Sequence, residues 1–325
     1  MKYRAYRYRL YPNEEQKVLI AKHLGSCRFI YNYALAKKVK AYQVDGTNLS
    51  RFDIQADLPN MKKSDEYCWL KEVNSLSLQA SLANLDSAYT KFFREHKGFP
   101  NFKSKKDSKQ SFSIPQNTKV DFENGRVFIP KFKIGIKAKL HRTFEGIVKS
   151  STITRTSTGK YFISILVEVN ESDVPMKPIC ESKAVGIDLG IKTFAVLSDG
   201  TEIPNPKHLK QSLDKVKKLQ RSLSHKNKGS KNRDKARRKL ALAHEQVTNR
   251  RNDFLHKVTS YLVNNYDTIC LEDLNVKGMV KNHHLAQALE DIAIGTFNAL
   301  LKYKAKERGV NILRIGRFEP SSKMC

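Results

Sequence analysis

One carboxylate inside an otherwise apolar strand limits the folds open to this chain more than any other sequence feature. Asp188 lies in the run Ala184-Val185-Gly186-Ile187-Asp188-Leu189-Gly190, and Glu272 ends a second apolar run over residues 267–272. A carboxylate is expensive to bury in such a strand, so it needs a metal ion, a cation or a hydrogen-bond network. The two runs predict strands whose acidic side chains meet at one edge of a sheet.

This pair of carboxylates is typical of a two-metal centre. RNase H-like enzymes carry one on the first strand and a second on the parallel strand beside it, where they hold divalent ions about 4 Å apart. Mg²⁺ suits one or two carboxylates plus substrate phosphate. We therefore predict Asp188 and Glu272 as catalytic residues and metal ligands, and Asp273 as structural, because it should point the other way along the strand. The alternative is that both carboxylates simply end strands in turns.

The net charge predicts a polyanionic partner. The chain has 60 Lys and Arg against 32 Asp and Glu, a formal charge of +28. Self-repulsion of this size destabilises a compact fold unless phosphate backbones compensate for it. The alternative is a basic protein that is associated with the ribosome or is merely soluble.

The sequence predicts a cytoplasmic, nucleoid-associated bacterial protein without a membrane partner. No apolar run approaches the roughly 18 residues of a transmembrane helix, and the basic, tyrosine-rich N-terminus lacks a signal-peptide core. The five cysteines form no C-x-x-C pair, which favours free thiols.

Periodicity in the first half predicts a strand, a set of helices and a small β-barrel. Residues 2–10 alternate as in a half-exposed strand, and Asn13 is a candidate helix cap. Helices are expected from Asn13 to about Lys22, from Ser26 to about Tyr42 and from Ser75 to Glu95. Trp69 is expected in the core. Hairpin turns at Asn124-Gly125 and Ser157-Thr158-Gly159 predict the barrel over residues 110–170.

After a linker at residues 171–180, a second domain is expected. Its predicted strands are 184–189, 192–198, 267–272 and 310–315, and its predicted helices are a basic pair over 207–264, broken near 227–230, and one over 285–308. The fold class is thus α+β and multidomain.

Basic and aromatic residues in four segments are predicted to contact nucleic acid. Between Asn205 and Arg251 there are sixteen Lys or Arg against three acids, which favours a face that follows phosphates over a solvated hairpin. For the aromatic candidates, core packing is the alternative. The candidates are Lys2, Arg4, Tyr6, Arg7, Tyr8, Arg9, Arg28, Tyr31, Asn32, Phe102, Lys103, Lys105, Lys106, Lys228, Lys231, Arg233, Lys235, Arg237, Arg238, Lys239, Arg250 and Arg251.

Motifs along nearly the whole chain resemble the TnpB family, transposon-encoded RNA-guided nucleases related to type V CRISPR effectors. They are Tyr8-Arg9-Leu10-Tyr11-Pro12, Arg28-Phe29-Ile30-Tyr31-Asn32, Phe99-Pro100-Asn101-Phe102-Lys103-Ser104, Val185-Gly186-Ile187-Asp188-Leu189-Gly190-Ile191-Lys192, Asn249-Arg250-Arg251-Asn252-Asp253-Phe254, Leu271-Glu272-Asp273-Leu274-Asn275-Val276-Lys277-Gly278-Met279 and Pro320-Ser321-Ser322-Lys323-Met324-Cys325.

The resemblance implies an oligonucleotide-binding-like β-barrel (wedge) with a helical recognition insertion, followed by an RNase H-like RuvC domain. The expected boundaries are 1–10 and 101–175 for the wedge, 11–100 for the helical domain and 181–325 for the RuvC-like domain. The implied partners are a guide RNA and double-stranded target DNA, which form an RNA–DNA hybrid beside a short motif that the protein recognises. A monomer is expected.

The C-terminal end departs from the family pattern. In the family, Pro-Ser-Ser-Lys leads into a four-cysteine zinc knuckle and then a third catalytic Asp, whereas this sequence ends at Cys325. One cysteine makes no structural zinc site, so zinc is not expected. Glu290 and Asp291 are expected to be solvated helix residues rather than substitutes for the missing carboxylate.

The function expected on this basis is guide-RNA-dependent DNA binding with impaired or absent cleavage, as in a transcriptional repressor that acts by occupancy. Loss of one carboxylate from a preorganised site lowers the rate by orders of magnitude. The first alternative is an active Mg²⁺-dependent endonuclease whose C-terminal segment is missing from this sequence. An unguided transposase and a structural RNA-binding protein are further alternatives.

Overall fold

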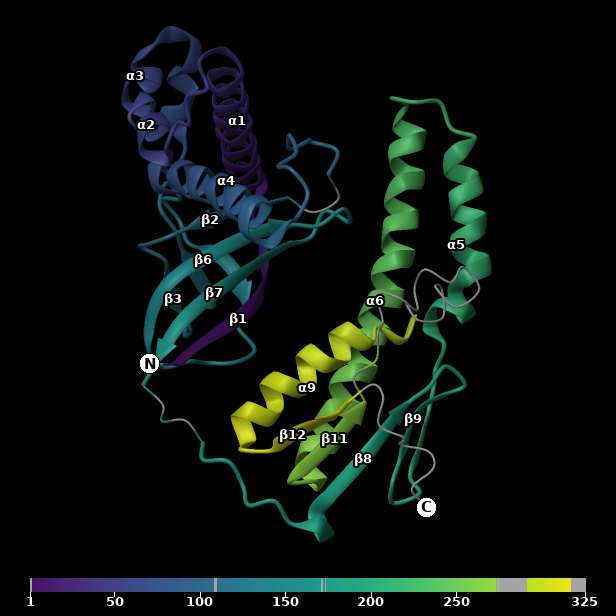
Figure 1. The fold of residues 1–325 in the computed structure, drawn as a ribbon. Helices are drawn as coiled ribbons and strands as arrows, with labels where there is room; N and C mark the ends of the chain where they lie inside the picture. The colour runs from purple at the N-terminus through teal and green to yellow at the C-terminus, as the bar shows by residue number, and fades with distance from the viewer. Residues whose placement is uncertain are drawn as a thin grey trace. The chain divides into compact units, whose positions relative to one another are not determined.

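The computed structural model divides the chain into two compact units, residues 1–172 and 173–325 (Figure 1). It describes residues 2–107, 110–170, 172, 174–272, 274 and 291–316. Asp273, Glu290 and Cys325, which carry expectations above, lie outside these ranges.

The first unit contains a seven-stranded antiparallel sheet in the order β2-β6-β7-β1-β5-β4-β3. The strands are β1 (Lys2–Tyr11), β2 (Gln110–Ile114), β3 (Lys119–Asp121), β4 (Arg126–Phe128), β5 (Ile136–Lys139), β6 (Ile147–Arg155) and β7 (Tyr161–Val169). The predicted hairpins are confirmed: Gly125 joins β3 to β4 with φ 61°, and Gly159 joins β6 to β7 with φ 79°. Both angles suit glycine, which has no Cβ to clash in the left-handed region.

The alternation of β7 gives this unit its core. Tyr161, Ile163, Ile165 and Val167 are buried on one face, as predicted, and pack with Leu10 of β1. This burial of every second residue fixes the register of the strand, because a slip by one residue would turn the apolar set to water.

Helices α1 (Glu14–Asp45), α2 (Arg51–Gln55), α3 (Asp57–Lys63), η1 (Asp65–Glu72) and α4 (Ser75–Glu95) lie between β1 and β2. The bounds predicted for α4 are confirmed, and so is the Asn13 cap: Asn13 Oδ1 accepts from Gln16 N at 2.8 Å and Gln16 Oε1 accepts from Asn13 N at 3.1 Å. The predicted break between Lys22 and Ser26 is wrong. Gly25 keeps helical backbone, because packing of the apolar face of α1 outweighs the low helix propensity of one glycine.

The second unit contains a five-stranded sheet in the order β10-β9-β8-β11-β12. The strands are β8 (Ala184–Leu189), β9 (Thr193–Leu197), β10 (Glu202–Pro204), β11 (Thr268–Glu272) and β12 (Asn311–Ile315). β8, β9 and β10 pair antiparallel, whereas β11 is parallel to both β8 and β12.

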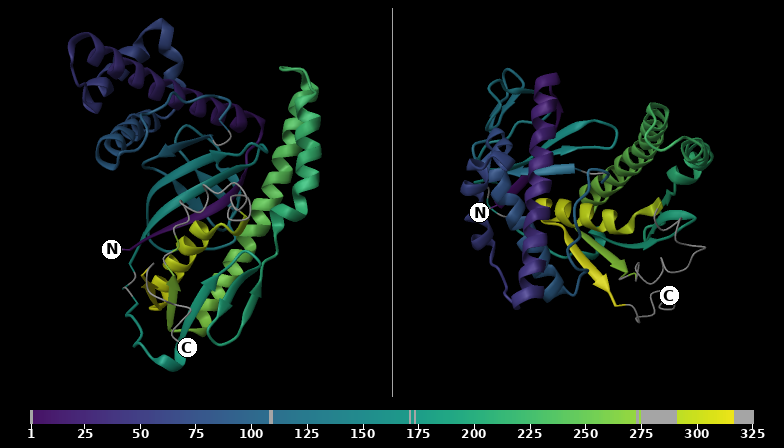
Figure 2. Two further views of the ribbon diagram at one scale, coloured as in Figure 1. Left: turned by 45° about the vertical axis from the view of Figure 1, so that its right-hand side comes forward. Right: turned by 90° about the horizontal axis from the view of Figure 1, so that it is seen from above.

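The described helices of this unit include η2 (Glu181–Lys183), α5 (His208–Ser224), α6 (Lys231–Asn265) and α9 (Ile294–Arg308). α5 and α6 lie side by side as a hairpin (Figure 2). The pairing of β9 with β10 shifts register beside Phe194, whose ring is buried against Phe254 of α6 and Phe297 of α9. No helix in the described ranges is long and apolar enough to cross a membrane.

Candidate metal and nucleic-acid site

Asp188 and Glu272 lie at the carboxyl ends of adjacent parallel strands. The register between β8 and β11 ends with Ile187 beside Leu271, and Asp188 and Glu272 are the next residue on each strand. Ile187 and Leu271 are buried against the helices, and alternation turns the two carboxylates to the other face of the sheet. The strand order therefore brings the predicted pair to one edge.

The environment of the pair differs from the expectation in one respect. Asp188 is exposed and Glu272 is partly exposed, so neither carboxylate suffers the burial that the sequence suggested. The reason is that β8 is buried on one face only, with Val185 and Ile187 inward. In the described part of the chain, no three His, Cys, Asp or Glu side chains are grouped to hold a metal ion.

Asp291 does not behave as a solvated helix residue, and this expectation is wrong. Both of its carboxylate oxygens lie 3.0 Å from the backbone N–H of Leu209 in the first turn of α5. A carboxylate at a helix N-terminus accepts a hydrogen bond from a backbone N–H that has no partner within the helix. The positive end of the helix dipole also stabilises its negative charge. Asp291 therefore fixes the start of the basic hairpin.

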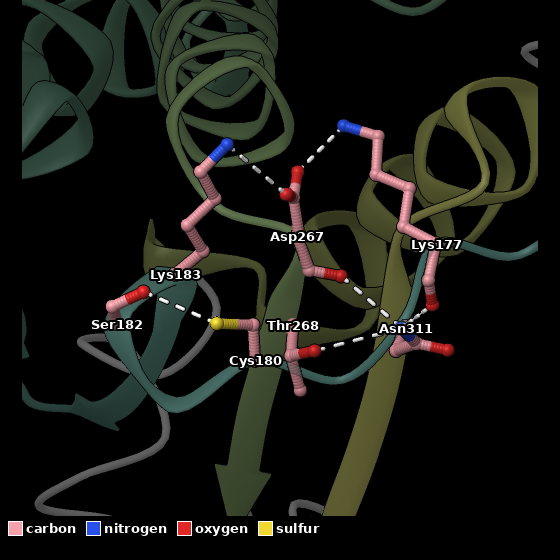
Figure 3. Close-up of polar contacts among 7 residues, drawn as sticks. All are labelled: Lys177, Cys180, Ser182, Lys183, Asp267, Thr268 and Asn311. Carbon is pink, nitrogen blue, oxygen red and sulfur yellow. Dashed lines mark hydrogen bonds and ion pairs between the residues drawn. The ribbon is translucent and has the colours of Figure 1, made fainter.

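The opposite end of the sheet carries a separate polar cluster around Asp267 (Figure 3). Its carboxylate lies 2.6 Å from Lys177 Nζ and 3.6 Å from Lys183 Nζ. The hydrogen bond from Lys177 is the main reason that the pKa of Asp267 lies below its ordinary value. Asn311 Nδ2 donates to Lys177 O at 2.9 Å, so the cluster fastens the segment after residue 173 to the sheet.

The outer face of β1 and β7 carries a cation–π platform. The Arg7 guanidinium lies 4.2 Å and the Arg9 guanidinium 5.0 Å from the centroid of the Phe162 ring. Arg9 also lies over Tyr11 at 5.6 Å. The sequence analysis missed Phe162 and Tyr11 as members of this surface, although the alternation of their strands turns both away from the core.

Tyr8 is a core residue, so its prediction as a nucleic-acid contact is wrong. Its side chain is 1% exposed, and its hydroxyl donates to Arg142 O at 2.8 Å. Lys2, Arg4 and Tyr6 are half-buried, and Arg4 and Tyr6 line a cavity of about 570 Å³ with Phe144.

The predicted contacts on α1 hold the basic loop after α4 in place. Tyr31 is only 5% exposed, which excludes it from stacking on a base, and Lys103 Nζ lies 3.9 Å from its ring centroid. Asn32 donates to Lys103 O at 2.9 Å and accepts from Lys103 N at 2.8 Å. Arg28 is half-buried, whereas Phe102, Lys105 and Lys106 are exposed.

The basic hairpin presents most of its predicted contacts to solvent. Lys228, Lys231, Lys235, Arg237, Arg238, Lys239 and Arg250 are exposed, and Arg251 is half-buried. Arg233 has a structural task, because its Nη1 donates to Leu223 O at 3.0 Å and to Lys226 O at 2.8 Å and closes the turn between α5 and α6. Arg237 pairs with Asp234 at 2.9 Å.

Comparisons with known proteins identify the family. The chain is 36% identical over 324 residues to a Streptomyces pristinaespiralis protein named "Putative RNA-guided DNA endonuclease", covering 99% of this chain and 79% of that one. It is also 36% identical over 278 residues to the Escherichia coli K12 protein "Putative RNA-guided DNA endonuclease InsQ", covering 86% and 68%. The chain belongs to the TnpB family.

Two family profiles agree with this TnpB assignment. A profile described as "Probable transposase" matches residues 164–283, and one described as "Helix-turn-helix domain" matches residues 1–47. In the described part of this second match, residues 2–47, the structure has one strand and one continuous helix and no helix-turn-helix unit.

The fold resembles that of a solved Cas12f1 chain. A Cas12f1 chain, from a complex with sgRNA and target DNA, aligns with a TM-score of 0.52 over 93% of this chain and 73% of that one. At 14% sequence identity, this likeness concerns the mixed α/β fold alone.

Proposed function

We propose that this chain binds a guide RNA and, directed by it, a double-stranded DNA target. The observation that carries the proposal is the row of exposed Lys and Arg side chains along the α5–α6 hairpin of a TnpB-family chain. The relatives are named for RNA-guided DNA cleavage, and the charge of +28 suits two nucleic-acid partners.

We assign the domain organisation that accompanies this function by the predicted boundaries. The five-stranded sheet has three antiparallel strands followed by two strands parallel to the first, the arrangement of RNase H-like domains, which supports a RuvC-like assignment. We assign the seven-stranded sheet to the wedge barrel, and the helices between β1 and β2 to the recognition insertion.

Mg²⁺ is the cofactor that the two carboxylates fit. Hard oxygen ligands on adjacent strands match its preference, and their exposure leaves room for a phosphate to approach. Bound there, the ion would supply electrostatic stabilisation of phosphodiester cleavage. Asp188 and Glu272 would hold it in place and face the scissile phosphate.

DNA binding and DNA cleavage are separate parts of the proposal. The impaired cleavage expected for residues 1–325 stays a prediction, and so do its role in repression and the alternative of an active endonuclease. Both versions share guided binding, which uses the basic surfaces and base pairing rather than the metal centre.

The test separates these activities in one preparation. The 325-residue chain is purified with its bound RNA, the RNA is sequenced, and a duplex matching its variable end is compared with a scrambled duplex. Guided binding predicts RNA-dependent retention of the matched duplex alone. Equal retention of both duplexes, or binding without RNA, would favour a transposase or a plain RNA-binding protein instead.

Cleavage is then measured with Mg²⁺ in the chain and in the variants Asp188→Ala and Glu272→Ala. Any cutting should fall at least about 100-fold in either variant, while duplex binding is retained. Glu202→Gln, an exposed carboxylate of the same sheet, is the matched control and should cut like the parent chain. Titration calorimetry with Mg²⁺ alone gives a readout of the carboxylates that does not depend on activity.

A further inference from the structure

No contact among the described residues explains the glycine in the middle of α1. Gly25 lies in a 32-residue helix, where glycine is less stable than alanine. Its backbone is helical rather than left-handed, so the conformation does not require it. A Cβ placed on Gly25 would meet only Arg28 Nη2, at 4.0 Å. Neither the backbone nor the neighbouring atoms exclude a side chain there.

The space that this glycine leaves open belongs to a cleft. The cleft has a volume of about 350 Å³ and is lined by Lys22, Gly25 and Ser26 of α1 and by Trp69 and Glu72 of η1. This volume lies at the lower end of the range for small-molecule sites. Both walls come from the first unit, so the cleft is complete within residues 1–172.

The wall of the cleft opposite α1 is formed by the aromatic ring of Trp69, whose N–H already has a hydrogen-bond partner. Trp69 Nε1 donates to Glu66 O at 3.1 Å, and the indole meets Phe29 edge-on at a centroid distance of 5.2 Å. The next residue, Leu70, is fully buried and fixes the segment. Trp69 nevertheless remains 37% exposed, which makes the expected core position wrong. What it offers to solvent is hydrocarbon and π-surface.

The rim of the cleft carries one charge of each sign. Lys22 and Glu72 form an ion pair between the two walls. A lysine at this position suits a phosphate, and a carboxylate accepts hydrogen bonds from ring N–H or amino groups. Ser26 is buried and spends its hydroxyl on Lys22 O at 2.9 Å, so the floor itself is apolar.

We propose that this cleft receives one unpaired nucleobase, which stacks on the Trp69 indole over the floor left open by Gly25. This site rests on the proposed function, because the base belongs to the bound RNA or DNA. A flat ring with polar edges and an attached phosphate fits the aromatic wall, the apolar floor and the charged rim. Proteins recognise single-stranded bases in this way, by stacking on aromatic side chains.

The sequence provides a direct probe, because Trp69 is the only tryptophan in the chain. The full chain, freed of RNA in high salt, is titrated with single-stranded 12-mers of RNA and DNA. Trp69 emission and the anisotropy of a label on the oligonucleotide are recorded together. Stacking predicts that emission is quenched in parallel with binding. Inorganic polyphosphate, which has charge but no base, should bind without quenching.

Variants that fill or remove the site complete the test. Gly25→Ala should stabilise α1 and at the same time obstruct the floor, so it should reduce the quenching without loss of fold. Trp69→Ala should weaken binding by about 5- to 100-fold, the range for one stacked base. Gly295→Ala is the matched control: Gly295 is also helical, with nothing within 4 Å of an added Cβ, and the change should leave quenching and affinity as they are.

The outcomes distinguish a failure of the nucleobase site from a failure of the proposed function on which it rests. Normal oligonucleotide binding with unchanged Trp69 emission would overturn the nucleobase site and leave the proposed function intact. Equal quenching by polyphosphate, or full quenching in Gly25→Ala, would also overturn it. Emission that changes with protein concentration alone would mean that a second copy of the chain fills the cleft. Absence of any nucleic-acid binding by anisotropy would instead remove the proposed function.

Discussion

His23 gives the first unit a pH-dependent stability that can be isolated. Its Nδ1 lies 2.9 Å from Leu19 O and its Nε2 accepts the backbone N–H of Asn74 at 3.1 Å, so the neutral ring with the proton on Nδ1 joins α1 to the start of α4. Burial lowers the pKa of His23 below the ordinary 6.5; the Leu19 hydrogen bond raises it and Lys131 lowers it. The folded protein therefore keeps this ring neutral at a pH where the unfolded chain protonates it.

The sign of the pH effect follows from that difference. Below about pH 6.5 the unfolded chain binds a proton at His23 that the folded protein does not bind. The free energy of unfolding therefore decreases as the pH is lowered, until the pH reaches the folded pKa. The slope is at most about 1.4 kcal/mol per pH unit for one group. From about pH 7.5 upward this histidine contributes almost no pH dependence.

Replacement of His23 by Leu should cost about 1–3 kcal/mol at pH 7.5, because the buried Asn74 N–H loses its acceptor. Leu19 O loses less, since it also accepts a helical hydrogen bond from within α1. The assay is urea unfolding followed by Trp69 emission, which reports on the first unit. The deficit of the variant should shrink as pH falls from 7 towards 5.

His23→Gln is the control, since it retains an acceptor but cannot titrate in this range. The difference in unfolding free energy between the Gln and Leu variants should therefore not depend on pH, whereas the difference between each variant and the parent chain should. A deficit for His23→Leu that stays constant from pH 5 to 8 would refute the assignment of a neutral, acceptor-bearing ring.

Three further outcomes are expected. Asp267→Asn should increase protease cutting at residues 174–183. Because the pKa of Asp267 is lowered, its carboxylate stabilises this segment above about pH 4 and loses that effect below, so the parent chain and the variant should be cut equally in acid. Phe297→Ala should cost the second unit about 3–5 kcal/mol in thermal or urea unfolding, since the ring is fully buried against Phe194 at 5.5 Å; a loss below 1 kcal/mol would contradict this packing. Changing Lys235, Arg238 and Lys239 together to Ala should reduce the slope of log affinity against log salt by about 2–3, measured by anisotropy with duplex DNA, and an unchanged slope would exclude these residues from the phosphate-binding surface.

Local signals predicted much of the fold correctly. The helix Ser75–Glu95 and the strand Ala184–Leu189 have the bounds expected from periodicity alone, and the Asn13 capping box formed as expected. Each of these depends mainly on residues that are close in sequence, and in each case the tertiary packing agrees with the local preference. The break expected near Gly25 failed because burial of residues such as Ile20 and Ile30 against the rest of the unit holds α1 together.

Predicting the candidate site required knowledge of pairing that periodicity does not contain. Apolar runs indicated that Asp188 lies within one strand and that Glu272 ends another, but only the parallel register of Ile187 with Leu271 brings the two residues to the same edge. The exposure of single side chains was harder still to predict. Tyr8 and Tyr31 lie in stretches whose composition is typical of nucleic-acid contacts, yet both are buried in the core, because a tyrosine suits both settings.

Trp69 and Gly25 show why a ligand site is the part of a sequence most easily misjudged. Taken singly, a lone tryptophan predicts core and a glycine predicts a helix break, and each prediction follows from a real energetic preference. The helix continues through Gly25 because its apolar face is packed, and Trp69 and Gly25 both line the cleft between α1 and η1. Each costs some stability there: the indole stays partly in water and the helix keeps a residue of low helix propensity. Since no neighbouring contact requires the exposed indole of Trp69 or the missing side chain at Gly25, an occupant of the cleft explains both better than folding does.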